Sequence, residues 1–248
     1  MSKLISKTVQ SLSVALVILS AAIFSAAQQP SGNKQNIRPE PPAQASVSPT
    51  PVVSPSDASG ARFSYEFTQS QFLLHHIVIE HDSTGHGKIT LERLNEDTPI
   101  VEELEISTVV LGRLSALWQS LRFLDSDTSY QADKQFPHLG TMRITMEQGD
   151  RKRTAEFNWT NNNDASALVS EYRRVADQAN LVFDISVARE NQPLNAPKLM
   201  EVMESMLKRN WLADPKQLVP LLKDISTDEH VPLIARNHAL RILQKIEK

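Results

Sequence analysis

The segment from Asp125 to His138 gathers several side chains of this 248-residue chain that could do acid–base or ligand chemistry. The candidates in it are Asp125, Asp127, Tyr130, Asp133 and His138. Paired carboxylates with a nearby histidine could bind a cation or exchange protons with a substrate. The segment has neither helical nor strand periodicity, and loops of this length are often functional. The sequence therefore predicts a ligand or partner loop here, with a solvated connection as the alternative.

Histidines near residue 80 give a weaker candidate, for a metal ion. His81, Asp82 and His86 flank a turn, across which their ligand atoms could converge as zinc ligands do. An EF-hand calcium loop starting at Asp82 fails, because its last position holds Arg93 where a bidentate Glu is needed. The alternative is a set of solvated or strand-face histidines around a glycine-assisted hairpin turn. The metal question stays open at this point.

Alternating apolar and polar residues predict the strands that would position these groups. The expected strands lie near residues 63–67, 73–80, 89–91, 100–106, 142–147 and 155–159. A helix is expected from Ser107 or Thr108, and a long one from Asp164, each with one apolar stripe. The spacing of Trp118 and Trp159 favours a place in the core. Strands gathered first and helices later predict an α+β fold, with an antiparallel sheet of about five or six strands packed against helices.

The ends of the chain differ in composition from this middle part. Residues 1–27 carry Lys3 and Lys7, then an apolar run, then Ser25-Ala26-Ala27, which is typical of a cleaved secretory signal peptide. Residues 28–60 are rich in Pro and Ser and predict a disordered linker. We therefore expect four parts: a signal peptide (1–27), a linker (28–60), an α+β domain (61–190) and a helical extension (191–248).

Two resemblances accompany this division. The stretch Asp214-Pro215-Lys216-Gln217-Leu218 to Ile225, followed by Val231-Pro232 to Leu243, resembles the two helices of a HEAT-type repeat. Residues 63–185 resemble, in their order of elements, exported bacterial domains of unknown function. The matching positions are Ile79, Asp82, Gly85, Leu124, Tyr130 and Gly140. The second resemblance implies a location outside the cytoplasm more than an activity.

Composition narrows the function classes. The chain has no cysteine, which excludes disulfides, thiolate metal sites and a lipoprotein anchor. Without residues 1–27 it carries a net charge of about −5, a poor basis for nucleic-acid binding. No phosphate loop, dinucleotide fingerprint or known catalytic motif occurs, so we expect no cofactor.

The leading hypothesis is an exported, periplasmic or extracellular protein-interaction module that is not an enzyme. Its expected partner is a protein of the cell envelope, and membrane contact is expected only if the signal peptide stays uncleaved. The alternative is a secreted hydrolase or a small-ligand or metal-binding protein that uses the 125–138 loop.

Overall fold

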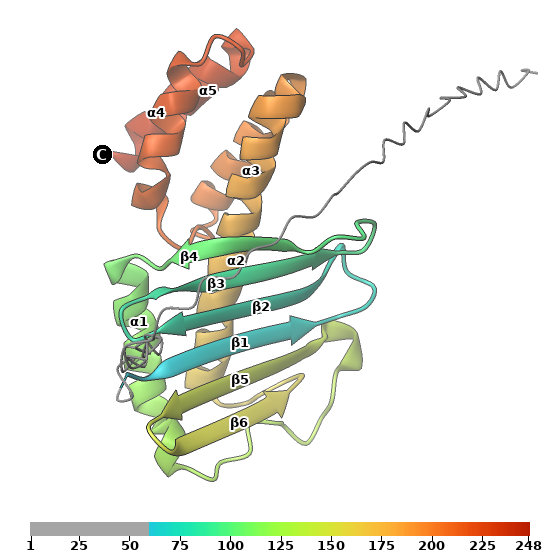
Figure 1. Cartoon of the computed structure of the whole chain (residues 1–248), viewed down its shortest axis with the longest axis vertical. Helices are drawn as coiled ribbons and strands as arrows, with labels where there is room; N and C mark the ends of the chain where they lie inside the picture. Colours follow the sequence, from blue (N-terminus) through green and yellow to red (C-terminus); the bar gives the residue numbers. More distant parts are fainter. Residues whose placement is uncertain (1–59) are drawn as a thin grey trace, which may run out of the picture. The chain divides into compact units, whose positions relative to one another are not determined.

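The structure, a computed structural model, describes residues 60–248. The predicted signal peptide and nearly all of the predicted linker lie outside these residues. Within them a six-stranded antiparallel sheet has the order β4-β3-β2-β1-β5-β6 (Figure 1). The strands are β1 (Arg62–Thr68), β2 (Leu74–Asp82), β3 (His86–Arg93), β4 (Ile100–Glu105), β5 (Thr141–Gln148) and β6 (Arg151–Phe157). With the helices described below, this confirms the α+β prediction.

The sheet buries one face, as the alternating sequence predicts. Tyr65 of β1 lies opposite Ile79 of β2 on one side and opposite Ile144 of β5 on the other. All three are at most 1% exposed. Since side chains alternate along a strand, every second residue of the neighbouring strands faces the same core. The two middle strands are β2 and β1, and β1 pairs with β5, which is far from it in sequence.

Two helices cover the buried face (Figure 1). Helix α1 (Thr108–Leu121) begins after Ser107, whose Oγ accepts a hydrogen bond from the Val110 N–H, as expected for an N-cap. Helix α2 (Asn163–Asn191) begins one residue before the predicted Asp164, because Asn162 is its cap. Tyr172 of α2 is fully buried and stacks on Tyr65 with the ring centroids 5.2 Å apart.

The C-terminal region is helical, as the sequence predicts. It contains α3 (Ala196–Lys208), α4 (Val219–Thr227) and α5 (Leu233–Ile246). The short 3₁₀ turn η3 (Pro193–Asn195) precedes α3, and η4 (Pro215–Leu218) precedes α4. Pro197 and Pro215 lie in first helical turns, where a missing N–H costs nothing. Asp214 caps η4 by accepting from the Lys216 N–H at 2.9 Å.

Helix α2 belongs to two hydrophobic cores. Leu168 and Tyr172, in its first half, pack with the sheet and α1. Leu181 and Ile185, in its second half, pack with α3, α4 and α5. The Arg174 guanidinium also donates to the Leu212 carbonyl at 3.0 Å, which ties α2 to the segment after α3. The sheet and the helical extension are therefore built around one shared helix.

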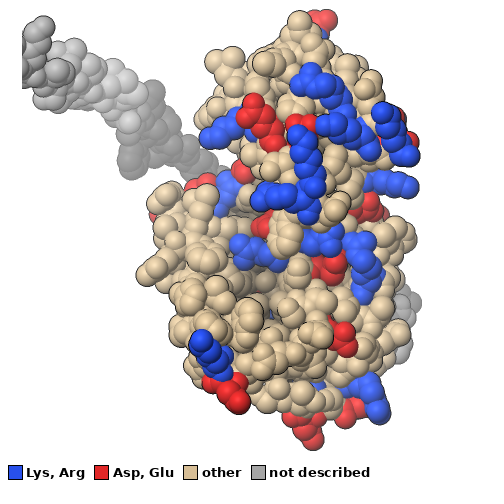
Figure 2. All heavy atoms as spheres, turned by 180° about the vertical axis from the view of Figure 1, so that it is seen from behind, with Lys and Arg blue, Asp and Glu red and all other residues tan. Residues whose placement is uncertain are grey.

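The second face of the sheet carries mainly polar side chains, and no helix of residues 60–248 covers it (Figure 1). Residues 60–162, which hold this sheet, contain 15 Asp and Glu against 10 Lys and Arg. Figure 2 shows the opposite side of the molecule, where Lys and Arg gather over the helical part. The open face is thus on the acidic part of the chain.

One expectation about the core is wrong. Trp118 is buried, but Trp159 is 44% exposed and packs edge-on against Phe136 with the centroids 5.2 Å apart. The alternation that predicted a buried Trp159 ends with β6 at Phe157, so the next inward position falls beyond the strand.

Candidate functional site

The 125–138 loop lies against the β6 edge of the sheet. The turns η1 (Phe123–Asp125) and η2 (Pro137–Leu139) mark its two ends. The Ala132 N–H donates to the Trp159 carbonyl at 2.9 Å, and the Asn158 N–H donates to Gln131 Oε1 at 2.9 Å. The Arg153 guanidinium donates to the Thr128 carbonyl at 2.7 Å. The loop therefore covers one end of an edge strand.

The loop holds its candidate residues in separate surroundings. Asp125 forms an ion pair with Arg151, whereas Asp127, Asp133 and His138 are exposed. Across residues 60–248, no hydrogen bond or ion pair joins His138 to any of the three carboxylates. The backbone carbonyl of His138 accepts from the Gln69 side chain instead. The structure does not bring these groups together as an acid–base set.

Tyr130 is the buried member of the loop, at 3% exposure. Its ring stacks on Phe123 with the centroids 6.0 Å apart, and the Arg153 guanidinium lies over it. The Tyr130 hydroxyl has no hydrogen-bond partner among the described residues. The ring fills the core beneath the loop.

The three candidate metal ligands, His81, Asp82 and His86, also lie in different surroundings. His81 is 5% exposed and points into the core, whereas His86 is exposed. Asp82 Oδ1 accepts hydrogen bonds from the N–H groups of Thr84 and His86 and closes the turn. These bonds and the Thr84 hydroxyl lower the pKa of Asp82. In the part of the chain that the structure describes, no three His, Asp or Glu side chains are grouped to hold a metal ion.

His81 takes part in a buried hydrogen-bond chain. Its Nδ1 lies 2.7 Å from the Asp82 carbonyl, an acceptor, so Nδ1 carries the proton. Its Nε2 then accepts from the Tyr172 hydroxyl at 2.8 Å, and Trp118 Nε1 donates to the same hydroxyl at 3.0 Å. Burial lowers the pKa of His81 against the opposing effect of Asp82. This chain satisfies polar atoms of the core.

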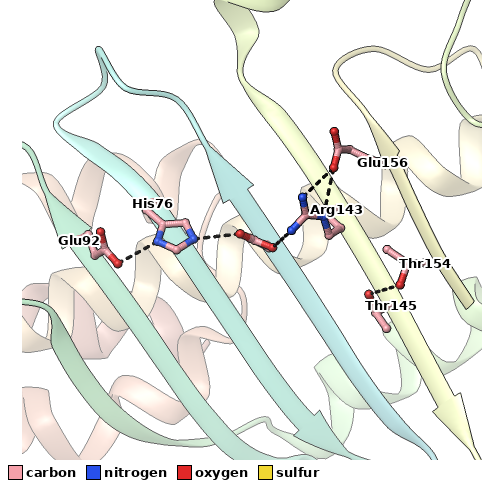
Figure 3. Close-up of polar contacts among 7 residues, drawn as sticks. His76, Glu92, Arg143, Thr145, Thr154 and Glu156 are labelled. Carbon is pink, nitrogen blue, oxygen red and sulfur yellow. Dashed lines mark hydrogen bonds and ion pairs between the residues drawn. The ribbon is translucent and has the colours of Figure 1, made fainter. Parts of the chain in front are cut away.

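A second network crosses the open face of the sheet (Figure 3). His76 Nδ1 donates to Glu92 at 2.9 Å and Nε2 donates to Glu66 at 3.1 Å. Glu66 also accepts from Arg143 at 2.7 Å, and Arg143 donates to Glu156 at 2.8 Å. Burial lowers the pKa of His76, but the bonds to Glu92 and Glu66 outweigh it and raise that pKa. The cations in this network all have carboxylate partners.

Strand β4 forms the other edge of the sheet, since within residues 60–248 only β3 pairs with it. The Ile106 N–H donates to the Gly85 carbonyl at 2.9 Å, which identifies one hydrogen-bonded pair. Such pairs alternate in an antiparallel ladder, so Glu105, Glu103 and Val101 turn their N–H and C=O groups away from β3. The Glu105 carbonyl is seen to point away from β3, because it accepts a hydrogen bond from Gln217 Nε2 at 3.0 Å.

Gln217 closes only one end of this edge. Within residues 60–248, no hydrogen bond reaches the outward N–H and C=O groups of Val101 or Glu103. The strand contains no Pro or Lys, and its pairing with β3 has no register shift. Natural sheets protect their edges with such features or with charge, and β4 has only its glutamates.

An apolar groove of about 350 Å³ runs between β4 and the second half of α2. Its apolar walls are Ile89, Leu91, Leu104, Ala179, Val182, Phe183 and Val187. Glu102, Glu103 and Glu190 also line it. A hollow of about 210 Å³ continues it past Leu104 and Val182 toward η4. We call the outward backbone of Val101 and Glu103, with this groove, the β4 edge site.

Sequence reasoning predicted the strand at 100–106 but not the β4 edge site. The order of strands depends on pairing between distant segments, so the sequence did not indicate which strand would lie at an edge. The one available signal was the run of glutamates, which is common on exposed edges.

The search for related proteins adds no assignment to this geometry. No helix within residues 60–248 has the length and apolar character needed to span a membrane. The sequence matches no model of a known protein family and no curated protein.

Proposed function

We propose that this chain is an exported, non-enzymatic protein of the cell envelope whose folded part binds another protein. The observation that carries this proposal is the β4 edge site, where outward backbone groups without a hydrogen-bond partner in residues 60–248 lie beside an apolar groove of about 350 Å³. Such a surface gives a partner both hydrogen bonds and apolar area to bury. The location rests on the signal peptide predicted from residues 1–27.

Two finer assignments belong to the same proposal. Residues 63–185 are proposed to be related to exported bacterial domains of unknown function, and α4 with α5 to be a HEAT-like helix pair. In support of the pair, Leu222 of α4 and Ala239 of α5 are buried in one core. Leu233 and Ile234 of α5 are more than half exposed, which leaves a smaller apolar area that a partner could use.

Site-specific photo-crosslinking in the native cell tests the proposal. A photoreactive residue placed at Val187, beside the groove, is expected to capture one dominant envelope protein. Matched positions are Leu240 on α5, 44% exposed, and the exposed Asp133 in the 125–138 loop. These are expected to give much less product. Equal labelling at all three positions, or no protein partner at any of them, would overturn the proposal.

A further inference from the structure

The β4 edge site has the geometry needed to accept one more strand. An added strand pairs through N–H and C=O groups that alternate along the edge. Val101 and Glu103 each offer one N–H and one C=O group, and the two residues are two positions apart. Gln217 occupies the Glu105 carbonyl and so limits the added strand to the Val101 and Glu103 end of β4.

Side chains of such a strand would meet two different surfaces. Those on the helix side would lie against the groove, whose lining includes Val182, Phe183 and Val187 of α2. Those on the open side would lie next to Val101 and Glu103, because residues at alternate positions share a face. Val101 is 60% exposed and Val187 is 38% exposed, so both surfaces are accessible within the described residues.

Charge at this edge selects the kind of strand. Glu102, Glu103 and Glu190 line the groove, and Glu105 follows on the same strand. Lys88, the cross-strand partner of Glu103, also pairs with Glu80 at 2.9 Å, so one cation is shared by two carboxylates and the edge stays net negative. Pairing β4 with β4 of a second copy would bring these glutamates together, and like charges across strands are destabilising. The edge therefore disfavours self-association and favours a cationic segment.

We propose that the β4 edge site binds an extended segment of another protein as a seventh strand, in which β-branched apolar residues alternate with Lys or Arg. This inference rests on the proposed function and adds the chemistry of the partner. The apolar residues fill the groove along α2, and the cations on the open side face Glu103 of β4. The backbone bonds supply affinity and the alternation supplies specificity.

The test uses the full chain and a capped heptapeptide of alternating Lys and Val as the probe. Binding is measured by titration calorimetry at low salt. Hydrogen exchange is followed at the Val101 and Glu103 amides, which become bonded if a strand is added. We expect slower exchange at these two amides, and weaker binding as salt rises.

Two control peptides separate strand addition from charge attraction. A peptide of alternating Glu and Val should not bind measurably. The Lys–Val peptide with alternate backbone nitrogens methylated should bind at least about tenfold more weakly, because it loses donors to the edge. Equal binding of the methylated peptide, or no change in exchange at Val101 and Glu103, would overturn the inference.

Variants of the edge supply the matched controls. The Val101 N–H points away from β3, so Val101→Pro keeps the β3–β4 ladder but removes a donor that the added strand needs. We expect Val101→Pro to weaken peptide binding at least about tenfold, whereas Val101→Thr should change it less than about threefold. Unchanged binding by Val101→Pro, with a circular dichroism spectrum like that of the unmodified chain, would overturn strand addition.

The outcomes distinguish this inference from the proposed function. Photo-crosslinking from position 187 is repeated in the Val101→Pro background. A partner that is lost there supports strand addition, and a partner that is still captured overturns it while the proposed function stands. Absence of any partner in the unmodified chain overturns the proposed function. A chain that dimerises through this edge in light scattering would replace the cationic segment by a second copy, and would overturn the inference.

Discussion

At the scale of single residues, two histidines of β2 have opposite environments although they are close in sequence. His76 lies on the open face between two carboxylates, so its charged form is stabilised. His81 lies in the core, where its Nε2 must accept from Tyr172, so its neutral form is stabilised. Burial lowers the pKa of His81. At His76 burial is the largest single effect and lowers the pKa, but the bonds and charges of Glu92 and Glu66 together outweigh it and raise that pKa.

The two histidines should make opposite contributions to stability as pH changes. The contribution of His81 is present above about pH 6.5 and is lost as pH falls, because the unfolded chain binds its proton more readily. That of His76 is present below about pH 6.5 and is lost as pH rises through its raised pKa. Urea unfolding of His76→Gln and His81→Gln across this range should give pH-dependent differences of opposite sign. Glu66→Gln should lower the pKa of His76 in an NMR titration, and an unchanged value would contradict the assignment.

Two buried tyrosines differ in whether the hydroxyl is satisfied. The Tyr172 hydroxyl contacts both His81 and Trp118, so Tyr172→Phe should cost about 1–3 kcal/mol of unfolding free energy. The Tyr130 hydroxyl has no partner among the described residues, so Tyr130→Phe should be neutral or stabilising. Chemical denaturation of both variants checks this. If Tyr130→Phe lowered the unfolding free energy as much as Tyr172→Phe, the Tyr130 hydroxyl would have a hydrogen-bond partner that is absent from residues 60–248.

At the scale of elements, the hairpin of β2 and β3 depends on a close backbone approach at Gly87. A Cβ on Gly87 would lie 1.8 Å from the Glu80 carbonyl oxygen, whereas one on Gly112 of α1 would meet nothing within 4 Å. Gly87→Ala should therefore destabilise the protein by at least about 2 kcal/mol. Gly112→Ala should stabilise it by about 0.5–1 kcal/mol, because alanine favours the helix. Thermal unfolding of the pair gives the comparison, and a neutral Gly87→Ala would contradict the hairpin geometry.

The elements also show how far local sequence information reaches. Alternation predicted the strands, because it depends only on neighbours in sequence. Capping by Ser107 and Asp214 was predictable for the same reason. The pairing of β1 with β5 joins distant segments and has no local signal.

The candidate site was less predictable than the elements. The 125–138 loop attracted interest for its carboxylates, but its contacts with β6 depend on where the chain places that edge. The burial of Tyr130 could not be predicted from the polar residues around it. The β4 edge site depends on strand order and on the position of α2, neither of which is encoded within a short window.

At the scale of the whole molecule, α2 couples the sheet core and the helical core. Met203 of α3 is fully buried in the second core, and its neighbour Val202 is 41% exposed. Met203→Ala should cost about 2–5 kcal/mol, whereas Val202→Ala should stay within about 0.5 kcal/mol.

Because the two cores share a helix, Met203→Ala should lower the unfolding free energy of both. Tryptophan fluorescence can follow them separately in a Trp159→Phe background, because the chain has three tryptophans. In that background Trp211→Phe leaves Trp118 as the probe of the sheet core, and Trp118→Phe leaves Trp211 as the probe of the helical part. In the Met203→Ala background both probes should shift to the same lower denaturant midpoint. A shift confined to Trp211 would mean that the two cores unfold independently.

The shared helix also constrains how a gene for this protein can change. Losing the codons for residues 196–248 would leave Leu181 and Ile185 without the side chains that bury them. Such a deletion would be tolerated only if α2 were shortened in the same event, or if its newly exposed apolar residues were replaced by polar ones. Without such a change in α2, recombination between α2 and α3 should give an unstable product, so we expect the sheet and its helical extension to be inherited together.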